Sequence, residues 1–214
     1  MQKPLIALLL AIACNSAFAS QEIAPAGYAA ARQQFVAGAN GDESSRDAAL
    51  EAFTKLAAGQ PGHPVYLAYI GSVTAMQGRD AMMPWDKMKY SEKGANMIEK
   101  ALTQLAPEHD AQLLNGTPES IETRLVAVNT LLALPGFMNR RAGGKRALQA
   151  ALDSKALEQA PAPVRANLFA IAARVAAEDK RGPEEIAYLR QAVATQANIP
   201  AVAKAAARLK ELGQ

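Results

Sequence analysis

One stretch in the first half of the chain constrains the fold most strongly. Gly71 lies within Tyr69-Ile70-Gly71-Ser72, a second glycine follows at 78, and an Ala101-Leu102 pair precedes Pro107. A small residue where two helices touch, a glycine near the end of the first helix and a proline after the second are typical of a helical hairpin that stacks on others like it. We therefore expect stacked hairpins, an architecture that forms scaffolds and binding grooves.

The composition of the whole chain also favours helices. Hydrophobic residues make up 50% of the sequence but aromatic residues only 5%, and alanine is abundant. Alanine is a strong helix former and lets helices approach closely. No segment alternates apolar and polar residues over the length of a strand with β-branched side chains. The sequence predicts an all-α fold of antiparallel helical hairpins without a sheet.

Capping residues, glycines and prolines divide the chain into nine predicted helices. They cover about 25–38, 43–59, 64 to between 78 and 81, 90–105, 118–134, 144–154, 163–179, 183–196 and 200–212. The second helix is expected to start after Asp42 or Ser44. In the fifth, Thr117 is the expected cap and Pro118 the first helical residue. The first helix is expected to bury Tyr28, Ala31, Phe35 and Val36 on one face.

The second hairpin resembles the tetratricopeptide repeat family. Ile70-Gly71 matches the paired Leu-Gly of that family, Gly78 its turn glycine, and Gly94, Ile98 and Ala101 fall near its packing positions. The first hairpin matches in its second helix only, through Ala49, Phe53, Leu56 and Pro61. The resemblance covers 25–212 in architecture and 44–107 in sequence. It implies a right-handed superhelix with a concave face that binds a peptide or protein; a generic helical bundle is the alternative.

The first 19 residues have the pattern of a signal peptide. Lys3 gives a positive start, Leu5–Ala13 is apolar, and Ala17-Phe18-Ala19 is a small-x-small cleavage site before Ser20. The apolar run is shorter than the roughly 20 residues that span a bilayer. We predict a signal peptide at 1–19 and one helical-repeat domain at 20–214 in the periplasm. The alternatives are a retained anchor helix and a lipoprotein acylated at Cys14.

Cysteine usage and charge exclude two further classes of function. The single cysteine, Cys14, lies inside the predicted signal peptide, so the mature chain has no disulfide and no thiol chemistry. The net charge of +3 falls to +2 when Lys3 is removed with the leader. A charge this small and this evenly spread argues against a nucleic-acid partner.

Sequence patterns of catalytic sites are missing. The chain has no Gly-x-Ser-x-Gly, His-Glu-x-x-His or Ser-x-x-Lys, and its two histidines, His63 and His109, fall in predicted loops. Gly143-Gly144-Lys145 is expected to be a linker, because Asn139 and Arg146 replace the glycine and hydroxyl residue of a phosphate-binding loop. We expect no catalysis, no cofactor and no metal site, with an unrecognised enzyme site as an alternative.

The strongest candidate for a binding site is the segment from Arg79 to Tyr90, which is expected to interrupt the second hairpin. It holds Trp85, the sole tryptophan, among alternating charges. Tryptophan with Arg or Lys is typical of a protein-binding hot spot. In the alternative, Trp85 fills the gap between hairpins and Pro84 starts an extra helical turn. The predicted partner-binding residues are Arg79, Asp80, Trp85, Lys87, Tyr90, Arg124 and Asn129.

Two other segments are open to a functional interpretation. Five of the seven methionines, Met76, Met82, Met83, Met88 and Met97, lie close together in the sequence. They favour adaptable packing, with Cu(I) binding through thioethers as an alternative. Asn139 to Arg146 carries the cations Arg140, Arg141, Lys145 and Arg146 in a predicted flexible turn. A solvated loop is the expectation, and contact with anionic lipid head groups is the alternative.

Overall fold

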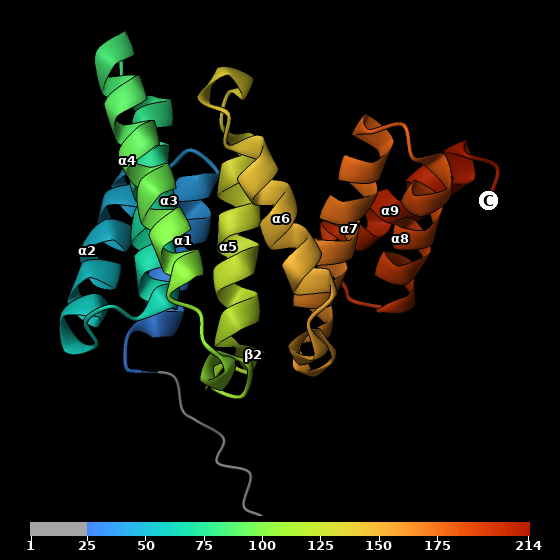
Figure 1. Ribbon diagram of the computed structural model, residues 1–214, viewed down its shortest axis with the longest axis horizontal. Coiled ribbons are helices and arrows are strands. Elements are labelled where there is room, and N and C mark those ends of the chain that lie inside the picture. The colour runs from blue at the N-terminus through green and yellow to red at the C-terminus, as the bar shows by residue number, and fades with distance from the viewer. Residues whose placement is uncertain (1–24) are drawn as a thin grey trace, which may run out of the picture.

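The computed structural model describes residues 25–214, and in this range the chain is mostly helical (Figure 1). The predicted signal peptide, its cleavage site and Cys14 lie outside the described residues. The α-helices are α1 (Tyr28–Ala39), α2 (Glu43–Gly59), α3 (Pro64–Asp80), α4 (Pro84–Thr103), α5 (Glu119–Ala133), α6 (Arg141–Leu152), α7 (Ala162–Glu178), α8 (Gly182–Ala194) and α9 (Pro200–Glu211). Three short 3-10 helices are η1 (Pro107–Asp110), η2 (Gly136–Met138) and η3 (Lys155–Gln159).

The helices pack as adjacent pairs. Helix α1 lies against α2, α3 against α4, α5 against α6, and α7 against α8, with α9 closing on α8 and α7. The first helix of a pair also contacts the pair before it, because α3 packs on α2 and α1, and α5 packs on α3 and α4. The predicted all-helical architecture of nine helices in successive pairs is thus confirmed for residues 25–214.

The start of α2 follows its predicted capping residue, whereas α4 begins well before its predicted start. The carboxylate of Asp42 accepts a hydrogen bond from Ser45 N at 3.1 Å, which caps α2 as expected. Helix α4 begins at Pro84, before the predicted start at Tyr90, since proline is well suited to the first helical position. Only Ala81, Met82 and Met83 connect α3 to α4, so the predicted interruption of this hairpin is wrong.

A two-stranded ribbon precedes α5 and corrects the prediction that no strand is present. Strands β1 (Leu113–Leu114) and β2 (Thr117–Pro118) pair antiparallel, with Leu114 opposite Thr117. The connecting residues Asn115 and Gly116 have φ of 49° and 77°, as a two-residue hairpin turn requires. Thr117 is therefore a strand residue, Pro118 precedes the helix, and α5 begins at Glu119.

Glycines make the contact between α3 and α4 exceptionally close. A Cβ added at Gly71 would lie 2.8 Å from Gly94 O and 2.9 Å from Ile98 Cγ1. The predicted close contact at Gly71 is confirmed. Gly78 lies inside α3, where a Cβ would collide with Ser91 Oγ, so this glycine serves helix packing and is not a turn residue.

Two large apolar clusters fill the interior. The first joins α1, α2 and α3 through aromatic rings, and the rings of Phe53 and Tyr69 stack at 4.2 Å between centroids. The second joins α5, α6 and α7. Of the four residues expected on the buried face of α1, Val36 is 55% exposed, because it lies about 100° around the helix from Phe35.

Candidate functional site

Arg79 and Asp80, two predicted partner-binding residues, form internal contacts. The guanidinium of Arg79 donates to the carbonyl oxygens of Ala39 and Gly38, each at 3.0 Å, and so caps the C-terminal end of α1. Asp80 accepts from Arg79 Nε at 2.6 Å and from Arg46 Nη1 at 2.5 Å. Hydrogen bonds from Arg79 and then from Arg46 hold the pKa of Asp80 below its usual range. These side chains fasten α1, α2 and α3 together.

The next part of the predicted site is open to solvent. Trp85, in the first turn of α4, is 67% exposed, and Lys87 is also exposed. Tyr90 is half-buried, with the ammonium of Lys89 5.6 Å from the centre of its ring. The alternative in which Trp85 fills a gap between hairpins is therefore wrong. Pro84 does start an additional helical turn, as that alternative expected.

Large exposed apolar side chains gather at one end of the molecule. They are Val36, Met82, Met83, Trp85, Met88 and Phe137. They belong to the last turn of α1, the α3–α4 connection, the first turns of α4, and η2. Figure 1 shows the start of α4 and η2 at the upper end of the molecule, and Arg79 ties the end of α1 to the end of α3. We call this surface the apolar end.

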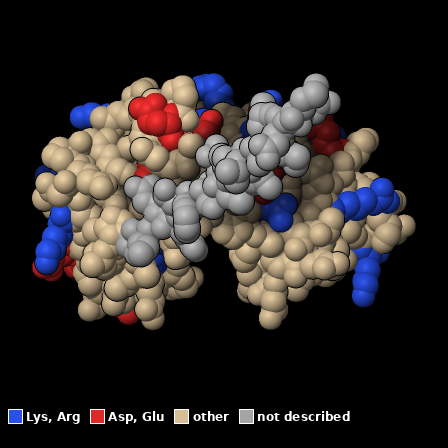
Figure 2. All heavy atoms as spheres, turned by 90° about the horizontal axis from the view of Figure 1, so that it is seen from below, with Lys and Arg blue, Asp and Glu red and all other residues tan. Residues whose placement is uncertain are grey.

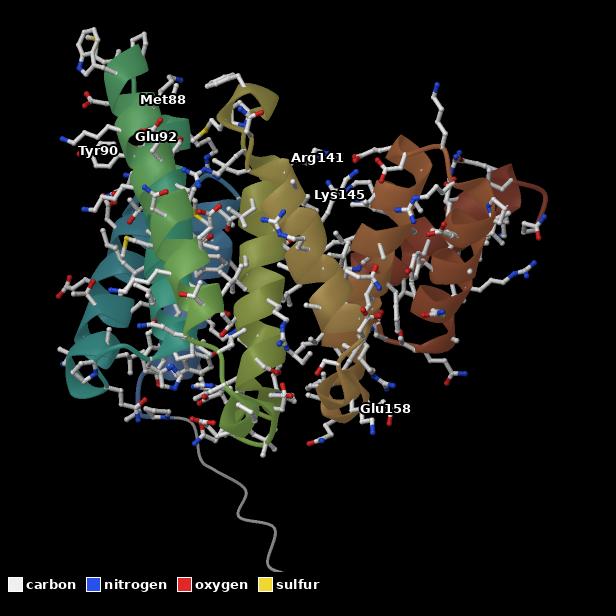
Figure 3. The ribbon with its side chains drawn as sticks, in the orientation of Figure 1. Met88, Tyr90, Glu92, Arg141, Lys145 and Glu158 are labelled. Carbon is white, nitrogen blue, oxygen red and sulfur yellow. The ribbon has the colours of Figure 1, made fainter. Side chains whose placement is uncertain are left out.

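The outer face of α4 continues from the apolar end as a stripe along the helix. A hollow of about 720 Å³ follows it, lined by Trp85, Met88, Lys89, Glu92, Lys93, Asn96, Met97 and Lys100. Met88 and Glu92 lie on the upper part of α4 in Figure 3. We call these eight residues the α4 stripe. All of them are exposed except Met97, which is half-buried.

The predicted methionine group is divided by the fold. Met82, Met83 and Met88 are exposed at the apolar end, whereas Met76 and Met97 are half-buried. Copper binding through thioethers stays a prediction. Among the described residues, no group of three or more His, Cys, Asp or Glu side chains is placed to hold a metal ion.

Arg124 and Asn129, the other two predicted partner-binding residues, do not join Trp85. Arg124 is half-buried, and its Nη1 lies 3.7 Å from Asp110 Oδ1 of η1, at the opposite end of the molecule. Burial lowers the pKa of this guanidinium from its ordinary value. Asn129 is exposed, and its amide donates to Leu125 O of the same helix at 3.0 Å.

The basic segment is a helix start and not a flexible turn or linker. Helix α6 begins at Arg141, and Arg141 pairs with Glu178 while Lys145 pairs with Asp179 at 2.6 Å. Both cations project from α6 toward α7 in Figure 3. Arg140 pairs with Glu99 of α4 at 2.6 Å. Three of the four cations predicted for lipid contact are therefore engaged between helices, which weakens that alternative.

A buried carboxylate that the sequence analysis missed joins three helices. Glu122 is 1% exposed, and it accepts hydrogen bonds from Tyr28 Oη at 3.1 Å and from Tyr69 Oη. Its Oε1 also lies 3.0 Å from Arg32 Nε. Burial, and then the charge of Glu122, raise the pKa of both tyrosines above the ordinary range, so the two hydroxyls remain proton donors.

One turn earlier on α5, Glu119 brings the two histidines together. His63 Nε2 lies 2.9 Å from Glu119 Oε1, and His109 Nε2 lies 4.0 Å from Glu119 Oε2. Glu119 is 5% exposed. We call Tyr28, Arg32, His63, Tyr69, His109, Glu119 and Glu122 the polar end; Figure 2 views the molecule from this side, where groups of Lys, Arg, Asp and Glu atoms are scattered among the other described residues. Two glutamates three residues apart on an apolar helix were the available signal in the sequence.

The described chain is thus an all-helical protein of successive packed helix pairs, with a buried polar end and an exposed apolar end. Comparison with protein-family models, with curated proteins and with solved structures finds no match. Within residues 25–214, no helix combines the length and the apolar character that crossing a membrane requires.

Proposed function

We propose that the protein is an exported helical-repeat scaffold that binds a protein or peptide partner in the cell envelope and carries out no catalysis. The observation that carries the proposal is the apolar end. Soluble proteins seldom leave a group of large apolar side chains uncovered unless the surface meets a partner. Tryptophan is the residue type most enriched at binding hot spots, and Trp85 is 67% exposed in the first turn of a helix that is firmly packed on α3.

The packing of the helices supports a tetratricopeptide-like right-handed stack as the architecture of this scaffold. The first helix of each later pair packs on the pair before it, as in stacked repeats, and α3 contacts both the α1–α2 pair and α5. In such a stack the rotation from one pair to the next has a constant right-handed sense. A crystal structure in which this rotation changes sign between pairs would contradict the superhelix and leave a generic bundle.

The predicted location rests on the first 19 residues of the chain. Removal of the leader after Ala19 would release a periplasmic protein that begins at Ser20. Mass spectrometry of the protein from an envelope fraction is expected to find Ser20 at the amino terminus. An acylated Cys14 at that position would instead establish a lipoprotein.

Site-directed photo-crosslinking tests the proposed binding surface. A photoreactive residue replaces Lys87, next to Trp85, or Lys55, an exposed residue of α2 that serves as the matched control. Crosslinked partners are expected from position 87 and not from position 55, and Trp85→Ala should remove them without loss of folded protein. Equal crosslinking from both positions, or adducts that persist in Trp85→Ala, would contradict the proposal.

Copper handling is a second candidate because Met82 and Met83 are adjacent and exposed, with Met88 nearby on α4. Thioethers are soft ligands that suit Cu(I). Titration under reducing conditions would detect Cu(I) binding that is lost in Met82→Leu/Met83→Leu. Binding that survives this double substitution would exclude these two methionines as ligands.

A further inference from the structure

Exposed methionine is concentrated at the apolar end. Within residues 25–214, the exposed methionines are Met82 at 90%, Met83 at 47% and Met88 at 38%, and they make up three of the six large apolar side chains of this surface. Met82 and Met83 come directly before Pro84 and Trp85 in the chain, and Met88 follows Trp85 by about one helical turn. Trp85 and Met88 also line the α4 stripe together.

The interior is built without methionine. Among the described residues, the buried apolar side chains are Ala, Val, Leu, Ile, Phe and Tyr, and the remaining methionines, Met76, Met97 and Met138, are half-buried. Methionine is usually a flexible filler of apolar cores, and this chain places it on the surface instead. A chemical change at the exposed thioethers would therefore alter the apolar end and leave the core intact.

The thioether group can be oxidised by peroxides. The sulfur lone pair forms a bond to one oxygen of hydrogen peroxide while the oxygen–oxygen bond breaks. The proton on the transferred oxygen passes through solvent to the departing oxygen, which leaves as water. Sulfur loses two electrons and the peroxide gains them. The product, methionine sulfoxide, is polar, and reductases specific for each of its two epimers convert it back to methionine.

We propose that Met82, Met83 and Met88 form a reversible oxidation site, at which peroxides convert the apolar end into a polar surface that no longer holds its partner. The effect on binding rests on the proposed function, whereas the oxidation itself does not. A partner that covers the sulfoxides leaves their oxygens buried without hydrogen-bond donors, which is unfavourable. Binding should therefore weaken about tenfold or more after oxidation.

Peptide mass spectrometry after mild treatment with hydrogen peroxide tests the location of the site. Met82 should be oxidised at least about fivefold faster than Met76 or Met97, because peroxide reaches an exposed sulfur more readily. Met83 and Met88 should follow before the half-buried methionines. The melting temperature should not change at this stage. Equal rates at all six methionines of the described residues, or early oxidation of Met76 or Met97, would overturn the assignment.

Hydrophobic-interaction chromatography on a phenyl column measures the change of surface without any partner. The natural protein should elute earlier after peroxide treatment and return to its original position after incubation with both methionine sulfoxide reductases. Met82→Leu/Met83→Leu/Met88→Leu keeps apolar side chains but removes the thioethers, so peroxide should leave its elution unchanged. Met97→Leu is the matched control and should still shift. A shift in the triple variant, or none in the natural protein, would overturn the proposal.

Photo-crosslinking from position 87 separates this inference from the proposed function, with each protein compared before and after peroxide. Loss of crosslinks in the natural protein, and no further loss in the triple leucine variant, supports both. Crosslinks that persist when the three methionines are fully oxidised overturn the control of binding and leave the proposed function standing. If untreated protein gives no crosslinks that depend on Trp85, the proposed function fails, and the control of binding fails with it.

Discussion

The two ends of this molecule use their unusual side chains in opposite ways. At the polar end, Glu119 and Glu122 are 5% and 1% exposed and are surrounded by hydrogen-bonding side chains from other elements. At the apolar end, Met82 and Trp85 are 90% and 67% exposed. A buried carboxylate is stable only when hydrogen-bonding or charged groups surround it. A large group of exposed apolar side chains, by contrast, gains free energy when a partner removes it from water. The first end therefore holds the helices together, and the second is available for binding.

This contrast explains why the charged groups of the predicted site differ in role. Arg79 and Asp80 are held by Arg46 and by carbonyl groups of α1. They support the exposed surface from below, while Trp85 and Lys87 form it. Substitutions of the buried polar groups, and of Arg79 or Asp80, should therefore affect stability, whereas substitutions of Trp85 or Lys87 should affect binding.

The largest effect on folding is expected at Glu122. Glu122→Ala leaves Arg32 and two tyrosine hydroxyls without their shared acceptor. Removing one partner of a buried ion pair costs about 3–5 kcal/mol, and a value near the lower limit is expected because Arg32 is one third exposed and can be rehydrated. Urea unfolding measures the loss. Glu51→Ala, at an exposed position of α2, is the control and should change stability by less than about 0.5 kcal/mol.

The contact between α3 and α4 provides the second prediction. Gly71→Leu should lower the free energy of unfolding by about 1–3 kcal/mol or more, because the added atoms meet Gly94 O and Ile98. Gly71→Ala should also be destabilising, since even its Cβ would lie 2.8 Å from Gly94 O. At Gly143 of α6 the nearest atoms lie 3.7 Å from an added Cβ, so Gly143→Ala should cost nothing. Equal thermal melting of Gly71→Leu and Gly143→Ala would show that the close contact is absent.

A smaller, pH-dependent effect is expected at Asp80. Its pKa is lowered in the folded protein, so its ion pairs stabilise the fold above the ordinary carboxyl value of 3.8, and this contribution is lost as the pH falls through the lower folded value. Asp80→Asn should cost about 1–2 kcal/mol at neutral pH, by loss of the charge-assisted hydrogen bonds. It should also reduce the decline of stability in acid. Unfolding curves that decline in parallel for both proteins would contradict this role.

The smallest effect on folding is expected at the apolar end itself. Trp85→Ala should change the free energy of unfolding by less than about 0.5 kcal/mol, whereas loss of a core tryptophan costs about 3–5 kcal/mol. The same substitution should weaken binding by about 2 kcal/mol or more if Trp85 is a hot spot. Lys87→Glu is the matched surface variant, and it should leave urea unfolding unchanged. Parallel losses of stability and binding in Trp85→Ala would make the residue structural.

Local signals in the sequence predicted the helices and the contact at Gly71. Proline, glycine and capping residues act within one or two turns, so the boundaries of α2, α3 and α9 follow from them. The Asn115-Gly116 turn was also a local signal, and its meaning as a hairpin was missed. Glu122 and Tyr28 lie 94 residues apart, and His63 and Glu119 lie 56 apart. Such contacts depend on how the helix pairs stack, and no local pattern encodes that.

The sequence alone also left open whether Trp85 is buried or exposed. The composition of the segment suggested either a core or a surface position, and the start of α4 at Pro84 decides between them. Starting the helix there turns Trp85 onto the outer face, while Gly94 and Ile98 of the same helix meet α3. A prediction that began the helix at Tyr90 could not assign Trp85 to a helix face.

Collisional quenching of the intrinsic fluorescence tests the central claim most directly, because Trp85 is the sole tryptophan of the chain. In dilute folded protein, acrylamide should quench Trp85 almost as efficiently as it does after unfolding in urea, with emission close to that of free tryptophan in water. If the folded protein instead shows blue-shifted emission and strong protection from acrylamide that do not depend on protein concentration, Trp85 belongs to the core and the apolar end is not a binding surface.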